Sequence, residues 1–226
     1  MSAVSLSLVA DSQPSREPFV FIADRLWLDF VNSDDAARAR RGGRLDALHD
    51  FDGFIRWLQE ASLLDGERAA ALSRRTQQQP TGASATLHEA RRLRSVLRAL
   101  AERGGATAVR VTQLAIAEIN RVLGRSAGTR RVEPDPTGGF VRNFVTVGDV
   151  FAGLLIPVIE SAADALVHDE LSRVRRCADP RCRRLFFDGS RNGKRRWCTM
   201  STCGNRAKAA RHRTKRKNAA PHRRSD

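Results

Sequence analysis

The chain has 226 residues, 41% of them hydrophobic, and this composition excludes a wholly disordered chain and fits one medium-sized domain with a small one, or one large domain. Its formal net charge of +15 is unevenly placed, because residues 171–226 hold 19 of the 40 Lys and Arg residues but only 3 of the 25 Asp and Glu residues. The sequence therefore predicts a near-neutral body joined to a basic module that binds a polyanion.

The N-terminal part predicts an arm and then an element whose type stays open. Residues 1–18 are rich in Ser, and we expect a flexible arm without a secretion signal, because no basic residues precede its short apolar run. Residues 19–35 hold enough aromatic and β-branched residues for a strand. The apolar residues between Leu26 and Val31 also fit one face of a helix, so the two periods conflict.

Four helices follow in the sequence pattern. The first has Asp50 as a candidate N-cap and Gly66 as a candidate stop, and the second starts from Asp65. The third covers the leucine-rich residues 86–105 and closes at a Gly-Gly pair. The fourth covers residues 112–125.

The end of the body predicts a hairpin and an apolar helix. Residues 129–147 carry two prolines and a Gly-Gly pair between short β-like runs, which indicates a hairpin or a pair of strands. The most apolar helix is expected over residues 149–171, where Pro157 should kink it or start its second half. Its apolar run is too short for the ~20 residues that cross a bilayer, so we expect a cytoplasmic, nucleoid-associated protein.

All four cysteines belong to one pattern, in which Cys177 and Cys182 form one pair and Cys198 and Cys203 form another, with fifteen residues between the pairs. Zinc takes four thiolates tetrahedrally with bonds of about 2.3 Å, and a short loop inside each pair lets the backbone curl around the ion. We expect one structural Zn²⁺ with no open position for water, and hence no catalytic role for it.

Other cysteine chemistries are less well matched by the pattern. Two disulfides are disfavoured by the absence of a secretion signal. Redox C-x-x-C chemistry needs a gap of two residues, where this chain has four. An iron–sulfur cluster also uses four cysteines, but the paired spacing suits zinc better.

The segments around the second cysteine pair predict a hairpin and a helix. Asn192-Gly193 is a preferred two-residue hairpin turn between strand-like flanks. Ser201 is a candidate N-cap of a final helix from about residue 202 to 217, which would place Cys203 in the first turn. The order of knuckle, hairpin and helix is that of a treble-clef zinc finger.

The run RWCTMSTCGNRAKAARHR resembles the CGNR zinc-finger family, named for the motif present here as Cys203-Gly204-Asn205-Arg206. In that family the finger follows a helical α+β module called the ABATE domain. The run LWLDFVNS is similar to that domain's LDFVNT-like signature, with Ser33 in place of Thr. The resemblance implies a bacterial stress-induced transcription regulator.

Together these observations predict an α+β protein with a mostly helical N-terminal domain, a small sheet and a C-terminal treble-clef-like finger. We expect a flexible arm at 1–18, an ABATE-like domain at 19–171, the finger at 172–213 and a disordered basic tail at 214–226.

The basic helix is predicted to contact nucleic acid, with the hairpin at phosphate level. The expected contact residues are Arg191, Lys194, Arg195, Arg196, Asn205, Arg206, Lys208, Arg211, His212, Arg213, Lys215 and Arg216. Few aromatic stacking faces are present, which favours DNA over RNA. A homodimer is expected because one finger has a small footprint. An RNA- or ribosome-associated protein stays the alternative.

The body carries no recognisable catalytic motif, because neither G-x-S-x-G nor H-E-x-x-H occurs, and we expect no enzyme. An enzyme domain that the finger targets to nucleic acid stays a further alternative. Asp29 and Asn32 are polar residues inside an apolar run. They either form cap or turn hydrogen bonds or line a polar floor for a small-molecule effector.

Overall fold

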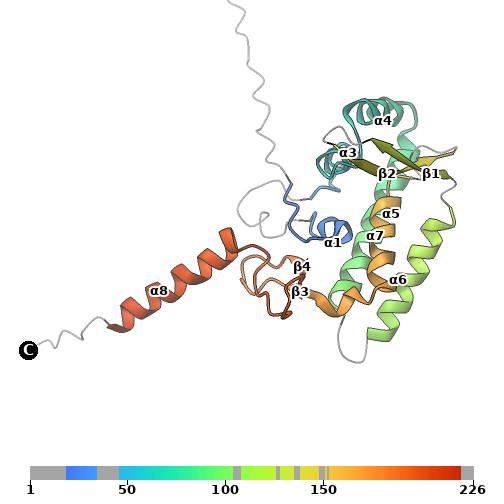
Figure 1. The fold of residues 1–226 in the computed structure, drawn as a ribbon. Helices are drawn as coiled ribbons and strands as arrows, with labels where there is room; N and C mark the ends of the chain where they lie inside the picture. The colour runs from blue at the N-terminus through green and yellow to red at the C-terminus, as the bar shows by residue number, and fades with distance from the viewer. Residues whose placement is uncertain are drawn as a thin grey trace, which may run out of the picture.

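The computed structural model describes residues 19–34, 46–103, 108–125, 128–134, 138–147, 151 and 153–219 (Figure 1). Its elements are α1 (Leu26–Val31), α3 (Phe51–Glu60), α4 (Gly66–Gln78), α5 (Pro80–Ala101), α6 (Ala108–Leu123), β1 (Gly128–Pro134), β2 (Phe140–Thr146), α7 (Ile156–Val167), the 3₁₀ turn η2 (Glu170–Arg173), β3 (Val174–Arg176), β4 (Leu185–Phe187), the π-helical turn η3 (Met200–Gly204) and α8 (Asn205–Ala219). The described chain is mostly helical with two antiparallel two-stranded sheets, which confirms the predicted α+β class.

The short helix α1 lies at the centre of the core. It contacts α5 and α7, and α6 packs against both of these longer helices. Trp27, Leu28 and Phe30 are all fully buried. Because α1 is covered by other elements on all sides, its apolar residues are not confined to one face. The spacing of these residues therefore could not distinguish a helix from a strand.

The predicted helix starts at two aspartates are confirmed. The side chain of Asp50 accepts a hydrogen bond from the N–H of Gly53 at 2.6 Å, and Asp65 accepts from Arg68 at 2.7 Å. The prediction that Gly66 ends the preceding helix is wrong, because Gly66 is the first residue of α4. The preceding helix α3 ends earlier because Ser62, at φ 59°, reverses the chain and lets Leu63 donate to the carbonyl of Leu58.

The later helices differ from prediction mainly at their starts. Helix α5 begins at Pro80, six residues before the predicted start, because proline is favoured in the first turn of a helix. The sequence pattern does not indicate this turn, since residues 80–85 show no helical spacing of large apolar residues. Its predicted Gly104-Gly105 stop lies outside the described residues. Pro157 falls in the first turn of α7 and so begins that helix instead of kinking it.

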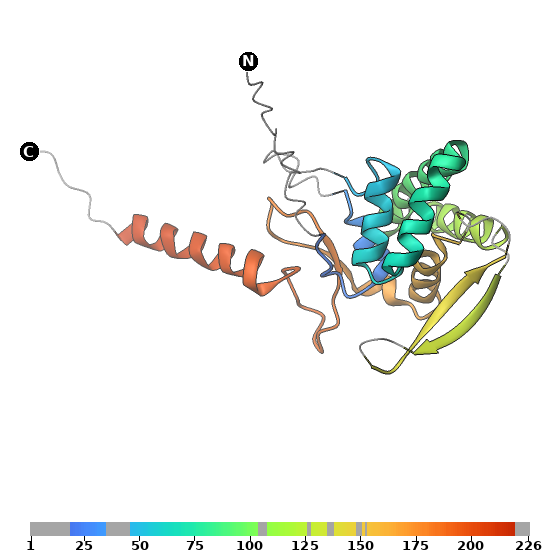
Figure 2. The same ribbon diagram turned by 90° about the horizontal axis from the view of Figure 1, so that it is seen from above.

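The predicted hairpin forms from β1 and β2, which pair from Gly128 with Thr146 to Pro134 with Phe140. Figure 2 shows it extending along one side of the helices. Gly138 has a φ of 107° in its connection, a value that favours glycine. No helix in the described part of the chain is long and apolar enough to cross a membrane.

The C-terminal helix α8 extends away from the rest of the molecule (Figures 1 and 2). It continues to Ala219, so residues 214–219 are helical and not part of the predicted tail. The run from 205 to 219 contains neither glycine nor proline, which explains the longer helix. The predicted arm at 1–18 and residues 220–226 lie outside the described residues.

Candidate metal centre and nucleic-acid interface

The sulfur atoms of Cys177, Cys182, Cys198 and Cys203 all lie within 4.8 Å of one another, and all four side chains are buried. The sulfur of Cys198 lies 3.5 Å from that of Cys182 and 3.7 Å from that of Cys203. A tetrahedral zinc site with Zn–S bonds of about 2.3 Å sets its sulfurs about 3.8 Å apart. The four residues therefore fit one metal ion, and their free thiols do not match the alternative of two disulfides.

The pKa values of the clustered thiols diverge, because their sulfurs lie close enough to share hydrogen bonds and are buried. The hydrogen bond between the two sulfurs lowers the pKa of Cys182 to about 5 and raises the pKa of Cys198. Burial raises the pKa of Cys203 to about 11. A thiol that coordinates zinc loses its proton, so Zn²⁺ would bind all four sulfurs as thiolates. The positive charge of the ion would offset the repulsion between these thiolates.

Arg206 is directed toward this cluster. Its Nη2 donates to the sulfur of Cys203 at 3.0 Å, and its Nε donates to Oδ2 of the buried Asp179 at 2.7 Å. Asp179 belongs to the loop of the first cysteine pair, where its carbonyl accepts from the N–H of Cys182. Arg206 therefore joins that loop to the start of α8, and its guanidinium is committed to the metal centre.

The other residues of the CGNR motif also have structural roles. A Cβ on Gly204 would lie 2.6 Å from the sulfur of Met200, so a larger residue in the turn η3 requires this exposed methionine side chain to move. Asn205 donates to the carbonyl of Ser201 at 3.1 Å. The N-cap is Thr199 and not the predicted Ser201, because η3 starts earlier and its Thr202 N–H reaches the Thr199 hydroxyl.

A turn forms one residue before the predicted Asn192-Gly193 position, because the N–H of Gly193 donates to the carbonyl of Ser190 at 3.2 Å, and no strand follows it in the described chain. Strand β4 pairs instead with β3, across the loop of the first cysteine pair. The fully buried carboxylate of Asp188 shapes the connection by accepting from the N–H groups of Ser190 and Arg195 at 3.0 and 2.9 Å. The edge of β4 that a second hairpin strand would use is bonded to Ala23 and Asn32 instead.

Arg195 is also held within the fold. Its Nε donates to the carbonyl of Trp197 at 3.0 Å, and its Nη1 donates to Asp24 at 2.6 Å. The guanidinium carbon lies 4.6 Å from the centre of the Phe186 ring. Like Arg206, this predicted contact residue therefore stabilises the finger through its side chain.

Most of the other predicted contact residues are exposed. These are Arg191, Lys194, Arg196, Asn205, Lys208, Arg211, His212, Arg213 and Lys215. Every side chain from 208 to 215 on α8 is exposed. Arg216 lies within α8, but its side chain lies outside the described residues.

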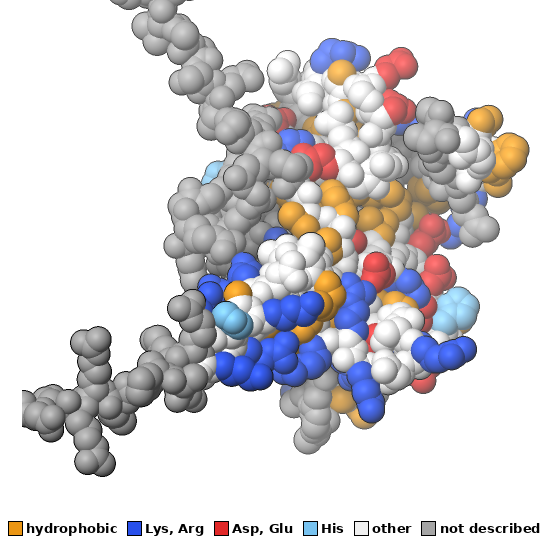
Figure 3. Space-filling view, turned by 60° about the vertical axis from the view of Figure 1, so that its left-hand side comes forward, with side chains coloured by type: hydrophobic (Ala, Val, Ile, Leu, Met, Phe, Trp, Pro, Cys, Tyr) orange, Lys and Arg blue, Asp and Glu red, His pale blue; other side chains and the backbone are white. Residues whose placement is uncertain are grey.

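Three further arginines, outside the predicted contact residues, are also exposed. Arg175, Arg181 and Arg183 lie on or beside the loop that joins β3 to β4, and all three are exposed. Figure 3 shows Lys and Arg side chains gathered over the lower part of one face. The run RVRRCADPRCRR signalled this surface, because cations flank both cysteines of the first pair.

Asp29 and Asn32 bind backbone groups at the junction of body and finger. Oδ1 of Asp29 accepts from the N–H groups of Ile22 and Ala23 at 2.9 and 3.0 Å. The Asn32 amide donates to the carbonyl of Leu185 at 2.8 Å and accepts from its N–H at 3.0 Å. Both side chains therefore form hydrogen bonds with the backbone, which is the first of the two interpretations that the sequence allows.

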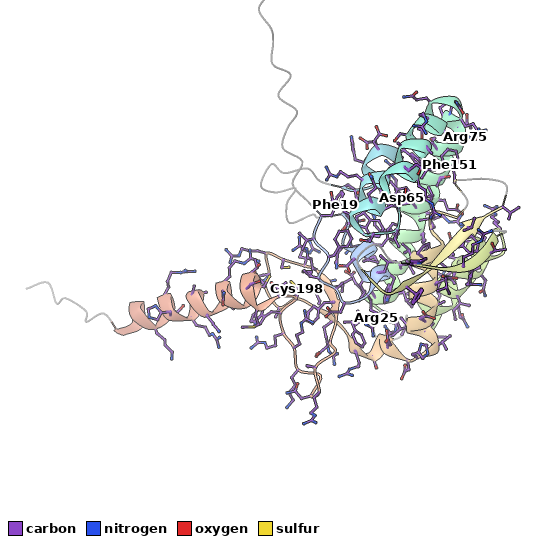
Figure 4. The ribbon with its side chains drawn as sticks, turned by 45° about the horizontal axis from the view of Figure 1, so that its top comes forward. Phe19, Arg25, Asp65, Arg75, Phe151 and Cys198 are labelled. Carbon is purple, nitrogen blue, oxygen red and sulfur yellow. The ribbon has the colours of Figure 1, made fainter. Side chains whose placement is uncertain are left out.

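These contacts cover the free edge of β4 with residues of the body. The N–H of Phe187 donates to the carbonyl of Ala23 at 2.9 Å. Arg25 pairs with Glu170 and places its guanidinium carbon 3.9 Å from the centre of the Phe187 ring. Figure 4 shows Arg25 beside the finger and Cys198 near the base of α8. Body and finger therefore share one packed boundary.

Comparisons with known families agree with this arrangement. The ABATE family model, described as "Putative stress-induced transcription regulator", matches residues 24–169. The CGNR zinc finger model matches residues 173–216. Neither description is that of an enzyme. A search of curated proteins found no match.

Proposed function

Because this chain belongs to the ABATE family and ends in a CGNR zinc finger, we propose that it regulates transcription by binding duplex DNA through α8. The finger, taken as residues 172–213, aims the helix, and the body, taken as residues 19–171, responds to a small effector. The cysteines and Zn²⁺ act structurally in this proposal and take no part in catalysis.

The exposure of α8 carries the proposal. From residue 208 to residue 215 every side chain is exposed, and none of these residues is a large apolar one. An isolated helix of this length is marginal in water, and like charges along it oppose its formation. A polyanion supplies the stabilisation that packing does not, because phosphates offset the charge along the whole helix.

The direction of α8 supports contact with a groove. Arg206 anchors its first turn on the finger, and at 100° per residue the side chains of Lys208, Arg211 and Lys215 lie on the opposite face. The major groove of DNA admits an α-helix, and arginine there pairs with guanine. The alanines between these cations allow close approach.

Binding measurements on zinc-loaded full-length protein test this function. We expect Lys208→Ala with Arg211→Ala to weaken binding to a labelled mixed-sequence duplex and to reduce the magnitude of the salt slope by about two. The matched control is Arg74→Ala with Arg110→Ala, which removes two exposed cations from α4 and α6. Equal effects of the two pairs would contradict a specific role for α8.

Competition between duplex DNA and structured RNA decides between the two nucleic acids. We expect the duplex to compete better, since the finger exposes little aromatic surface for base stacking. Tighter binding of RNA would replace the proposal with an RNA-associated function.

We also propose that two chains bind one DNA site. Light scattering of the complex measures the number of chains per duplex, and a single chain per duplex would contradict this proposal.

The proposed effector acts near α1, which contacts both the helices of the body and β4 of the finger. Trp27 is fully buried, and its Nε1 has no hydrogen-bond partner in the described part of the chain. A thermal-shift screen against metabolites tests this, with Trp27→Phe as the variant that keeps an aromatic ring and removes the donor. A flat response to a broad library would contradict the sensing role.

A further inference from the structure

Arg183 has an unusual backbone conformation for a long side chain. Its φ is 60°, in the left-handed region, and its side chain is exposed. The other described non-glycine residues with positive φ are Asp24, Ser62 and Asp169, all with short polar side chains. Glycine adopts this conformation without steric cost, whereas other L residues collide with their own backbone.

The metal centre explains the conformation but not the residue type. The N–H of Arg184 donates a hydrogen bond to the sulfur of Cys182, and its carbonyl accepts from the N–H of Cys177 at 2.8 Å. The chain must therefore turn sharply at residue 183 to close the loop around the sulfurs. A glycine would make the same turn with less strain, so the turn itself does not require an arginine at this position.

The charge of Arg183 is not offset within the finger. Residues 172–219 contain two acidic residues, Asp179 and Asp188. Asp179 binds Arg206 and lies 3.5 Å from Nε of Arg181, and Asp188 binds Ser190 and the backbone of Arg195. In the described part of the chain, neither Arg175 nor Arg183 has an ion-pair partner, and both are exposed.

This charge lies close to the base of α8. Arg206 of α8 is bonded to Asp179, which belongs to the same loop as Arg183. The sulfurs of Cys182 and Cys203 belong to one cluster, which fixes the loop against the first turn leading into α8. The loop therefore lies at the base of α8 on the side of Arg206, where it is placed to meet the phosphates at the edge of the groove and not the bases that Lys208 and Arg211 face.

We propose that Arg175, Arg181 and Arg183 form a second phosphate-contact surface, the knuckle surface, which binds the backbone of the same DNA duplex that α8 enters. This inference rests on the proposed function, because it assigns a further part of the same DNA interface. Backbone contacts of this kind fix the position and angle of a recognition helix without reading sequence.

The test compares four variants of the zinc-loaded full-length chain on one labelled mixed-sequence duplex at several salt concentrations. Arg183→Gly should bind several-fold more weakly, with the magnitude of its salt slope reduced by about one. Arg183→Lys should keep the slope of the unchanged protein. Ser62→Gly makes the same backbone change far from the finger, and Arg74→Gln removes one cation from α4; both should bind normally.

Zinc content and melting temperature separate a lost contact from a damaged finger. Arg183→Gly should keep one zinc per chain and melt no lower than Ser62→Gly. Unchanged affinity and salt slope in Arg183→Gly would overturn the inference, and so would a weakening that accompanies zinc loss. If the duplex binds and the α8 variants weaken it while Arg183→Gly does not, the proposed function stands and only the knuckle surface fails.

Discussion

At the scale of single residues, the finger contains two kinds of cation. Arg195 and Arg206 turn inward and bind a carbonyl, a carboxylate or a sulfur. Lys208 and Arg211 are exposed. The distinction matters for mutagenesis, because removing an inward arginine alters the finger itself, whereas removing an exposed one alters only what the finger binds.

Arg206→Lys tests this distinction. Lysine cannot reproduce the forked contact with Asp179 and Cys203, so we expect zinc affinity to fall by about 10- to 100-fold. Chelator competition measures the affinity, and Lys208→Ala serves as the control that leaves it unchanged. Equal zinc affinity in Arg206→Lys and the unchanged protein would show that Arg206 does not support the metal centre.

Asp29 predicts a pH dependence. Burial raises its pKa to about 6, against the opposing hydrogen bonds from Ile22 and Ala23. Its folded pKa lies above the unfolded value, so its contribution favours folding most at low pH and is lost as pH rises through about 6. An asparagine in its place carries no charge at any pH, so Asp29→Asn should gain about 1 kcal/mol relative to the unchanged protein between about pH 5 and pH 8.

Urea unfolding at these pH values measures the difference for zinc-loaded protein. The lower limit avoids the loss of zinc that protonation of the thiolates causes in acid. A stability difference that does not vary with pH would mean that Asp29 titrates near its ordinary value in the folded chain.

At the scale of elements, β4 is a strand of the finger that the body completes. Its inner edge pairs with β3, and its outer edge meets the side chain of Asn32 and the carbonyl of Ala23. Leu185 and Phe187 belong to the main core, while Phe186 packs with the cysteines. The strand therefore faces two cores from successive residues, as the alternation of side chains along a strand requires.

Asn32→Ala should destabilise the folded chain by about 2–4 kcal/mol, because it leaves the buried N–H and carbonyl of Leu185 without partners. Denaturant unfolding measures the loss. The control Asn120→Ala removes an exposed amide from α6 and should change stability little. A similar small effect from both variants would contradict the role given to Asn32.

At the scale of the whole molecule, the shared boundary couples the metal to the body. Zinc removal should unfold the finger and also lower the melting temperature of the body, since Leu185 and Phe187 lie in the main core. In a Trp197→Phe variant the finger has no tryptophan, so the fluorescence of Trp27 and Trp57 measures unfolding of the body alone. A body transition that is insensitive to chelator would contradict this coupling.

Patterns local in sequence could be predicted from the sequence alone. The four cysteines, the aspartate caps at Asp50 and Asp65, and the hairpin between residues 128 and 146 each lie within one short stretch of the chain. The excess of cations after residue 171 likewise predicted which end carries the basic helix. Such features need no knowledge of the distant chain, because their hydrogen bonds and ligands close short loops.

The tertiary structure decided what depends on distant partners. The type of α1 followed from burial on every side, and the role of Asn32 followed from Leu185, 153 residues away. Arg206 turned inward because folding brought Asp179 beside it. A side chain's partner is set by which backbone and charged groups the fold places next to it, and no pattern of spacing within one segment records that.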